Sequence, residues 1–246
     1  MASTGTQQAV ASPASAQTSP DVTRQRRLED LGLIMLVGFA PLVVAAVYLL
    51  FVPLQLPAGY VNFRFLSGLT YEIATLSLFL CLMQRQGRAL RTIGLTFHWT
   101  DIPTGLGLFL LSYLGSYFLA WCAQISYFFW NHTYFHFRDS APLYAGASVV
   151  LFAVYSFAAP FFEETLVRGY LMTELIGVAC PVWMATIASI MLQTTYHLYY
   201  GISSALFVGF GFAVSSIYFA RSRKLVPVIL GHLFWDLTAT YLHLRR

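Results

Sequence analysis

The chain has 246 residues, of which 58% are hydrophobic and 10% are charged. An average soluble domain has about 25% charged residues, so this composition excludes an ordinary soluble protein and indicates an integral membrane protein. The net charge of +4 is no sign of nucleic-acid binding, because the basic residues lie in groups between apolar segments, and we expect no nucleic-acid partner.

Residues 1–23 differ from the rest of the chain because they are rich in Ala, Ser, Thr and Gln. Such a segment cannot bury a core, so we predict a disordered tail. It also lacks the charged start and apolar stretch of a signal peptide. After the tail we expect N-terminal transmembrane helices with an interfacial link at 84–101, together covering 24–139, and a helical core at 140–246.

Long apolar segments follow one another along the remaining chain. Runs of about 18 or more apolar residues are candidates for transmembrane helices. We therefore predict an all-α fold, a polytopic transmembrane helical bundle with seven spans, or eight as the alternative. The segments are 31–52, 65–83, 102–130, 144–176, 181–197, 204–220 and 225–244.

Basic residues cluster at three places, before the first segment and in two of the connections. With seven spans and the N-terminus inside, nine basic residues lie on the cytoplasmic side and four outside, as the positive-inside rule requires. An eighth span would bring the C-terminal arginines inside but export the cluster at 221–224. We expect a multi-pass protein of the cell inner membrane with a cytoplasmic N-terminus. The inside set is Arg24, Arg26, Arg27, Arg85, Arg88, Arg91, Arg221, Arg223 and Lys224.

The segment from Pro160 to Arg168 places two adjacent carboxylates in apolar sequence, where ionisable groups are functional candidates. A helix that restarts at Pro160 would place Glu163 and Glu164 in its first turn, where the helix dipole stabilises anions. Glu164 and Arg168 are four residues apart and can pair. Glu163 points to a neighbouring face and has no local partner. A purely structural ion pair is the alternative interpretation of Glu164 and Arg168.

Two later segments carry further polar candidates. His197 ends the 181–197 segment. His232 and Asp236 are four residues apart in the last segment, so they share a helical face. Packing or a structural pair is the alternative for each of them. Glu72 is isolated in the 65–83 segment, and we expect it to pair with an arginine or to line a cavity.

The order of these residues resembles the motif set of the CPBP (Abi) family of intramembrane proteases. That family includes type II CAAX prenyl endopeptidases and bacteriocin-processing and immunity proteins. The resemblance covers about residues 140–244 and implies a CAAX-protease-like peptidase. The matching residues are Glu163, Glu164 and Arg168, then His197, then His232 and Asp236.

The resemblance also implies a role for each of these residues. Glu163 with His197 would activate the water that attacks the peptide bond. His232, with or without Asp236, would stabilise the oxyanion. The remaining pair of the first motif, Glu164 and Arg168, would hold the site in shape.

Two positions differ from the family pattern. Gln193 stands where the family usually has Phe, and Asp236 stands where it often has Asn. Ionised Asp cannot donate a hydrogen bond to an oxyanion. Asp236 must therefore be protonated, or must orient His232 instead.

The expected substrate is a membrane protein or lipidated peptide in the lipid bilayer. Zinc is possible as a cofactor, but the chain lacks a His-Glu-x-x-His helix, so a metal-free mechanism is favoured. A non-catalytic scaffold or immunity-type protein is the first alternative. A transporter or proton channel is less favoured, because the 160–168 pattern has no second copy.

A shared site sets one condition on the fold. His197 ends its segment, whereas His232 lies well inside the last one. The two can meet only if the 198–203 link enters the bundle, which is allowed where protein or a water-filled cavity surrounds it. Gly201 would help that link to turn.

Overall fold

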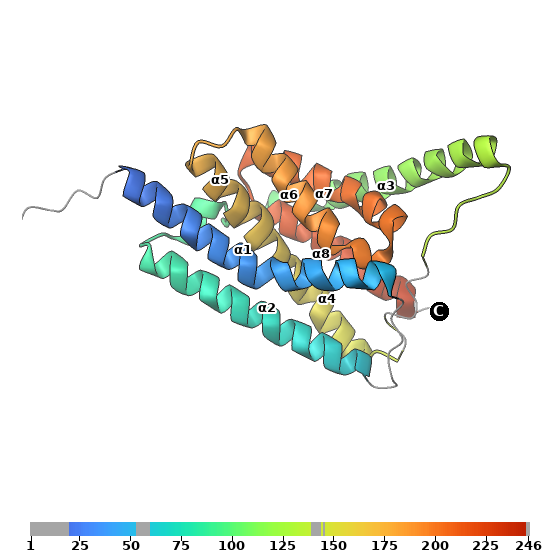
Figure 1. Ribbon diagram of the computed structural model, residues 1–246, viewed down its shortest axis with the longest axis horizontal. Coiled ribbons are helices and arrows are strands. Elements are labelled where there is room, and N and C mark those ends of the chain that lie inside the picture. Colours follow the sequence, from blue (N-terminus) through green and yellow to red (C-terminus); the bar gives the residue numbers. More distant parts are fainter. Residues whose placement is uncertain (1–19, 53–59, 139–143, 145, 245–246) are drawn as a thin grey trace, which may run out of the picture.

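The computed structural model describes residues 20–52, 60–138, 144 and 146–244. Every regular element in these ranges is a helix, so the predicted all-α bundle is confirmed (Figure 1). Residues 1–19 of the expected disordered tail lie outside the described residues, whereas residues 20–23 begin α1. The helices are α1 (Pro20–Phe51), α2 (Tyr60–Arg85), α3 (Asp101–Asn131), α4 (Val149–Glu164), α5 (Thr173–Gly177), α6 (Val182–Tyr196), α7 (Ile202–Ser222) and α8 (Val226–Leu244).

Several helices are long and apolar enough to cross a membrane, which identifies an integral, multi-pass membrane protein. Helices α6, with 15 residues, and α8, with 19, are shorter. The number of spans stays a prediction. The long apolar segments are Arg24–Phe51, Tyr60–Arg85, Asp101–Asn131, Val149–Gly177 and Ile202–Ser222.

A continuous helical rod of α4, the π-helix η3 (Thr165–Met172) and α5 runs through the middle of the bundle (Figure 1). All eight residues of η3 are buried. Aromatic contacts fix the rod to its neighbours: Phe162 stacks on Phe39 of α1 at 5.5 Å, and Tyr170 meets Phe79 of α2 edge-on at 5.1 Å. Apolar packing against α1 and α2 therefore holds the part of the rod that contains Glu163, Glu164 and Arg168 in place.

Helix α1 continues through Pro41 without a break. A proline inside a helix leaves the carbonyl four residues earlier without its usual donor. That carbonyl belongs to Val37, and it accepts a hydrogen bond from the Tyr71 hydroxyl of α2. The contact repairs the lost bond and joins α1 to α2.

The three groups of basic residues meet at one end of the bundle. Buried Glu174 pairs with Arg27 Nε at 2.7 Å and with Arg88 Nη1 at 2.5 Å. Arg223 Nη2 donates to the Thr173 hydroxyl at 2.9 Å. The basic groups therefore share one end, as the loop assignment expected.

The connection between α2 and α3 is the link that the sequence predicts to lie at the membrane interface. It contains the single 3-10 turn η1 (Leu90–Ile93). Ile93 is buried, whereas Trp99 is 79% exposed. The connection therefore packs against the bundle at one point and leaves its tryptophan on the surface.

Close packing of α3 on α8 requires a glycine at position 105. A Cβ there would lie 2.6 Å from Leu230 Cβ and 3.0 Å from the Pro227 carbonyl oxygen. We expect Gly105→Ala to lower the free energy of unfolding by about 1–3 kcal/mol, because the helices must separate. Thermal unfolding in detergent micelles, followed by circular dichroism, measures the change.

Gly107→Ala is the matched control on the same helix, since a Cβ there meets nothing within 4 Å. It should leave the unfolding temperature unchanged or raise it slightly, because Ala favours a helix over Gly. Equal unfolding temperatures for the two variants would show that the α3–α8 contact tolerates extra volume.

Candidate functional site

The two adjacent carboxylates lie in the last turn of α4, and this overturns one expectation. Pro160 lies inside α4, so no new helix begins there. Pro160 and Ala159 are both buried, and this packing keeps the helix continuous despite one lost hydrogen bond. Glu163 and Glu164 therefore have no helix N-terminus to stabilise them and depend on side chains from other helices.

The helix changes to π geometry directly after Glu164. Such wider turns occur frequently at functional sites. The register still lets Arg168 Nη1 reach Glu164 Oε1 at 3.2 Å. The predicted pair of Glu164 and Arg168 is therefore present.

Arg168 is fully buried and uses three of its nitrogens. Besides the bond to Glu164, Nε donates to the Ser216 hydroxyl at 3.2 Å, and Nη2 donates to the Phe212 carbonyl at 3.1 Å. The Ser216 hydroxyl also lies 3.0 Å from that of Ser189. The guanidinium thus connects η3 to α7 directly and to α6 through the two serine hydroxyls.

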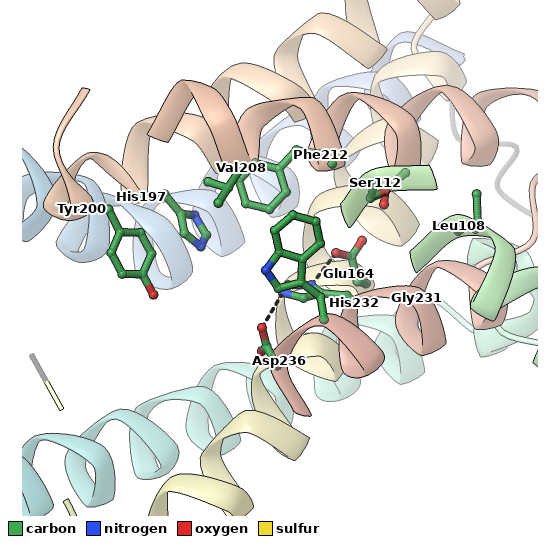
Figure 2. Close-up of a pocket in the computed structure, with 13 residues that line it drawn as sticks. Leu108, Ser112, Glu164, His197, Tyr200, Val208, Phe212, Gly231, His232 and Asp236 are labelled. Atoms are coloured by element: carbon green, nitrogen blue, oxygen red, sulfur yellow. Dashed lines mark hydrogen bonds and ion pairs between the residues drawn. The ribbon is translucent and has the colours of Figure 1, made fainter. Parts of the chain in front are cut away.

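Glu164 also holds His232. His232 Nδ1 lies 2.7 Å from Glu164 Oε1, so the imidazole donates to the carboxylate. Asp236 Oδ1 lies 3.7 Å from His232 Nε2, which is too long for a hydrogen bond. Glu164 therefore orients His232, and Asp236 remains beside the opposite ring nitrogen (Figure 2).

Glu163 receives its partners from α6. Its Oε2 accepts a hydrogen bond from Gln193 Nε2 at 2.7 Å and another from the Tyr196 hydroxyl at 2.6 Å. The carboxylate is half-buried, and Gln193 is fully buried. Glu163 has no partner on its own helix, as expected, but the sequence did not show that α6 would supply two donors.

His197 follows α6 directly, since that helix ends at Tyr196. Its Nδ1 lies 2.8 Å from the carbonyl oxygen of Gln193, which can only accept a hydrogen bond, so Nδ1 carries a proton. Nε2 is then left free to accept.

The link after His197 turns inward. It contains the 3-10 turn η4 (Leu198–Tyr200), and Gly201 has φ of +90°. The Tyr200 hydroxyl lies 2.5 Å from that of Tyr144. This satisfies the condition set by the sequence, since Tyr200 and His197 line the same cavity as His232.

That cavity has a volume of about 80 Å³ and lies between α3, α4, α7 and α8. Figure 2 shows His197 and Tyr200 on one side of it, and His232 and Asp236 on another. Glu164 lines it, whereas Glu163 is not among its wall residues. The wall consists of Leu108, Ser112, Glu164, His197, Tyr200, Val208, Gly211, Phe212, Ser215, Gly231, His232, Trp235 and Asp236.

Glu72 belongs to the same polar region, although its isolation in the sequence made it a weak candidate for the site. It is 5% exposed and hydrogen bonds to Tyr155. It also interacts electrostatically with Glu163, His232 and Asp236. The sequence signal was the presence of a single carboxylate in an otherwise uncharged segment, and its proximity to the site depends on tertiary packing.

Zinc was left possible by the sequence. The Nδ1 atoms of both histidines have partners, in the Gln193 carbonyl and the Glu164 carboxylate, so only Nε2 of each ring could bind a metal. In the described part of the chain, no three His, Cys, Asp or Glu side chains converge in a way that could hold a metal ion. The donor set as placed does not fit zinc.

Comparison with known proteins shows that the residues of this site lie in a segment that matches a protein-family model. A family model described as type II CAAX prenyl endopeptidase, Rce1-like, matches residues 145–238. The resemblance indicated by the motifs is confirmed there, and the match contains all six motif residues. No curated protein and no solved structure matches the chain.

Proposed function

We propose that this chain, which carries a type II CAAX prenyl endopeptidase Rce1-like domain at residues 145–238, is an intramembrane endopeptidase. It hydrolyses a peptide bond within or near the membrane. One observation supports this most strongly: His197 and His232 line one cavity, although His197 follows α6 and His232 lies within α8. Glu163 lies beside it, joined to His197 through Gln193.

Glu163 and His197 activate the water. Both hydrogen bonds from α6 go to Glu163 Oε2. In the proposed mechanism Oε1 accepts a proton from water, while Nε2 of His197 accepts the second hydrogen bond. The water oxygen bonds to the substrate carbonyl carbon, and the carbonyl becomes an oxyanion. When the C–N bond breaks, the proton held by Glu163 goes to the leaving amine.

His232 stabilises the oxyanion. Its Nδ1–H donates to Glu164. The proposed mechanism requires a second proton on Nε2, which faces the cavity beside Asp236. A preorganised donor of this kind stabilises the oxyanion more strongly in a site shielded from water than in a site exposed to it. Asp236 supports the protonated imidazole rather than donating to the oxyanion.

The basic end of the bundle supports a proposal for the orientation in the membrane. Arg27, Arg88 and Arg223 gather around α5. We place this end, and with it the N-terminus, in the cytoplasm, in a cell inner membrane. The substrate is a membrane protein or a lipidated peptide that reaches the cavity from the bilayer.

The test is cleavage by the full chain reconstituted in liposomes. Two internally quenched probes are used: a farnesylated peptide ending in Cys-aliphatic-aliphatic-X, and an unmodified apolar transmembrane peptide. We expect cleavage of at least one probe and a loss of about 100-fold or more in His197→Ala, because the water loses an orienting partner. His136→Ala, which changes an exposed histidine, is the control and should cleave normally.

A zinc chelator should leave the rate unchanged. If wild-type protein cleaves neither probe, or if His197→Ala cleaves as fast as wild type, the proposed peptidase mechanism is wrong. Binding of a probe without cleavage would instead support the scaffold or immunity-type interpretation.

A further inference from the structure

Gln193 connects the two groups proposed to activate water. Its side chain donates to Glu163 Oε2 at 2.7 Å, and its backbone carbonyl lies 2.8 Å from His197 Nδ1. The residue is fully buried. One position on α6 therefore contacts both Glu163 and His197, which come from separate helical segments.

The two polar atoms of the Gln193 side chain differ in their partners. Its Nε2 donates to Glu163, whereas its Oε1 is buried and has no hydrogen-bond partner among the described residues. A buried amide oxygen without a partner costs free energy, because it has lost its hydrogen bonds to water. An apolar side chain would avoid this cost, so the amide at this position calls for a reason other than packing.

We propose that Gln193 is a positioning residue for the water-activating carboxylate, an inference that rests on the proposed peptidase function. Gln193 and Tyr196 both donate to Oε2 of Glu163. These two bonds fix the plane of the carboxylate and leave Oε1 to accept a proton. Because the amide is neutral, it does so without adding charge beside the two adjacent glutamates.

Gln193 is also one of the positions at which this chain differs from the family that it resembles. The related family usually has Phe at this position, and Phe has no donor for a carboxylate. In this chain the orientation of Glu163 therefore depends on a hydrogen bond that an aromatic ring cannot supply. A change at Gln193 should alter turnover more than substrate binding.

The test compares kcat, KM and the pH–rate profile of Gln193→Leu and Gln193→Glu in the liposome assay. We expect Gln193→Leu to lower kcat by about 10- to 100-fold with KM within about twofold, because a misplaced catalytic group reduces turnover. Gln193→Glu places a third carboxyl group at hydrogen-bonding distance. The carboxyl groups then share a proton, so the acidic limb of the pH–rate profile moves to higher pH.

Gln124→Leu is the matched control. Gln124 lies on α3, and its Nε2 donates to the Phe135 carbonyl at 2.8 Å, away from the site. This variant loses a glutamine hydrogen bond of the same kind and should keep the wild-type kcat and pH profile. Unfolding temperatures of all variants identify any that fail to fold, and if Gln193→Leu fails, Gln193→Glu still gives the pH readout.

The outcomes separate the positioning role from the proposed function. Cleavage retained by Glu163→Ala would overturn the proposed mechanism itself. If Glu163→Ala is inactive while the Gln193 variants keep the wild-type kcat and pH profile, only the positioning role of Gln193 is wrong. A lower kcat in Gln193→Leu, with a shifted profile in Gln193→Glu, supports it.

Discussion

Glu163→Gln should fold like the wild-type protein and lose about 100-fold or more of kcat, because it removes the proton acceptor. The new amide oxygen can still accept from Gln193 and Tyr196, as Oε2 does now at 2.7 and 2.6 Å. The variant therefore keeps the hydrogen bonds to α6 and loses the group that accepts the proton from water. Initial rates on the two quenched probes, together with thermal unfolding, measure both effects.

Glu164→Gln is the informative comparison, since it changes the neighbouring carboxylate. Glu164 faces both Arg168 and His232. This variant should lose stability as well as cleavage, because a buried guanidinium loses its counter-charge. Active Glu163→Gln beside an inactive but stable Glu164→Gln would assign the base to Glu164, which lines the cavity.

Arg168→Met should lower the free energy of unfolding by about 3–5 kcal/mol, the usual effect of removing one partner of a buried ion pair. Arg168 is 0% exposed and Glu164 is 1% exposed, so water cannot replace the lost contact. The Ser216 hydroxyl and the Phe212 carbonyl also lose the hydrogen bonds that Arg168 donates to them. Denaturant or thermal unfolding in mixed micelles gives the difference.

The double variant Glu164→Gln with Arg168→Met is the control that separates the effect of an unpaired buried charge from the loss of the arginine side chain. It removes both buried charges, so it should recover part of the stability lost by Arg168→Met alone. An Arg168→Met protein as stable as wild type would mean that the pair does not hold the site in shape.

The sequence predicted those parts of the site that depend on local spacing. Glu164 and Arg168 pair as their four-residue separation indicates, and His232 lies near Asp236 for the same reason. The inward turn of the 198–203 link was also predicted, because the two histidines could not otherwise share a cavity. The four-residue pairs needed only helical geometry, whereas the inward turn also needed the shared site that the family resemblance implies.

The rest depends on contacts between distant segments. The partners of Glu163 come from a helix about 30 residues later, and no periodicity shows which face of α6 turns toward it. The restart at Pro160 was wrong because packing around a proline can outweigh one lost hydrogen bond. The π geometry of residues 165–172 has no signal in the residue types.

The short helix before His197 has a consequence for the surrounding lipid. Helix α6 has 15 residues and is therefore about 22 Å long, whereas the hydrocarbon core of a bilayer is about 30 Å thick. Lipid beside such a helix adapts to the hydrophobic mismatch by thinning, or the helix tilts less than its neighbours. For a membrane-crossing α6, the thickness of the bilayer thus becomes a variable in the energetics of the helix that leads to His197.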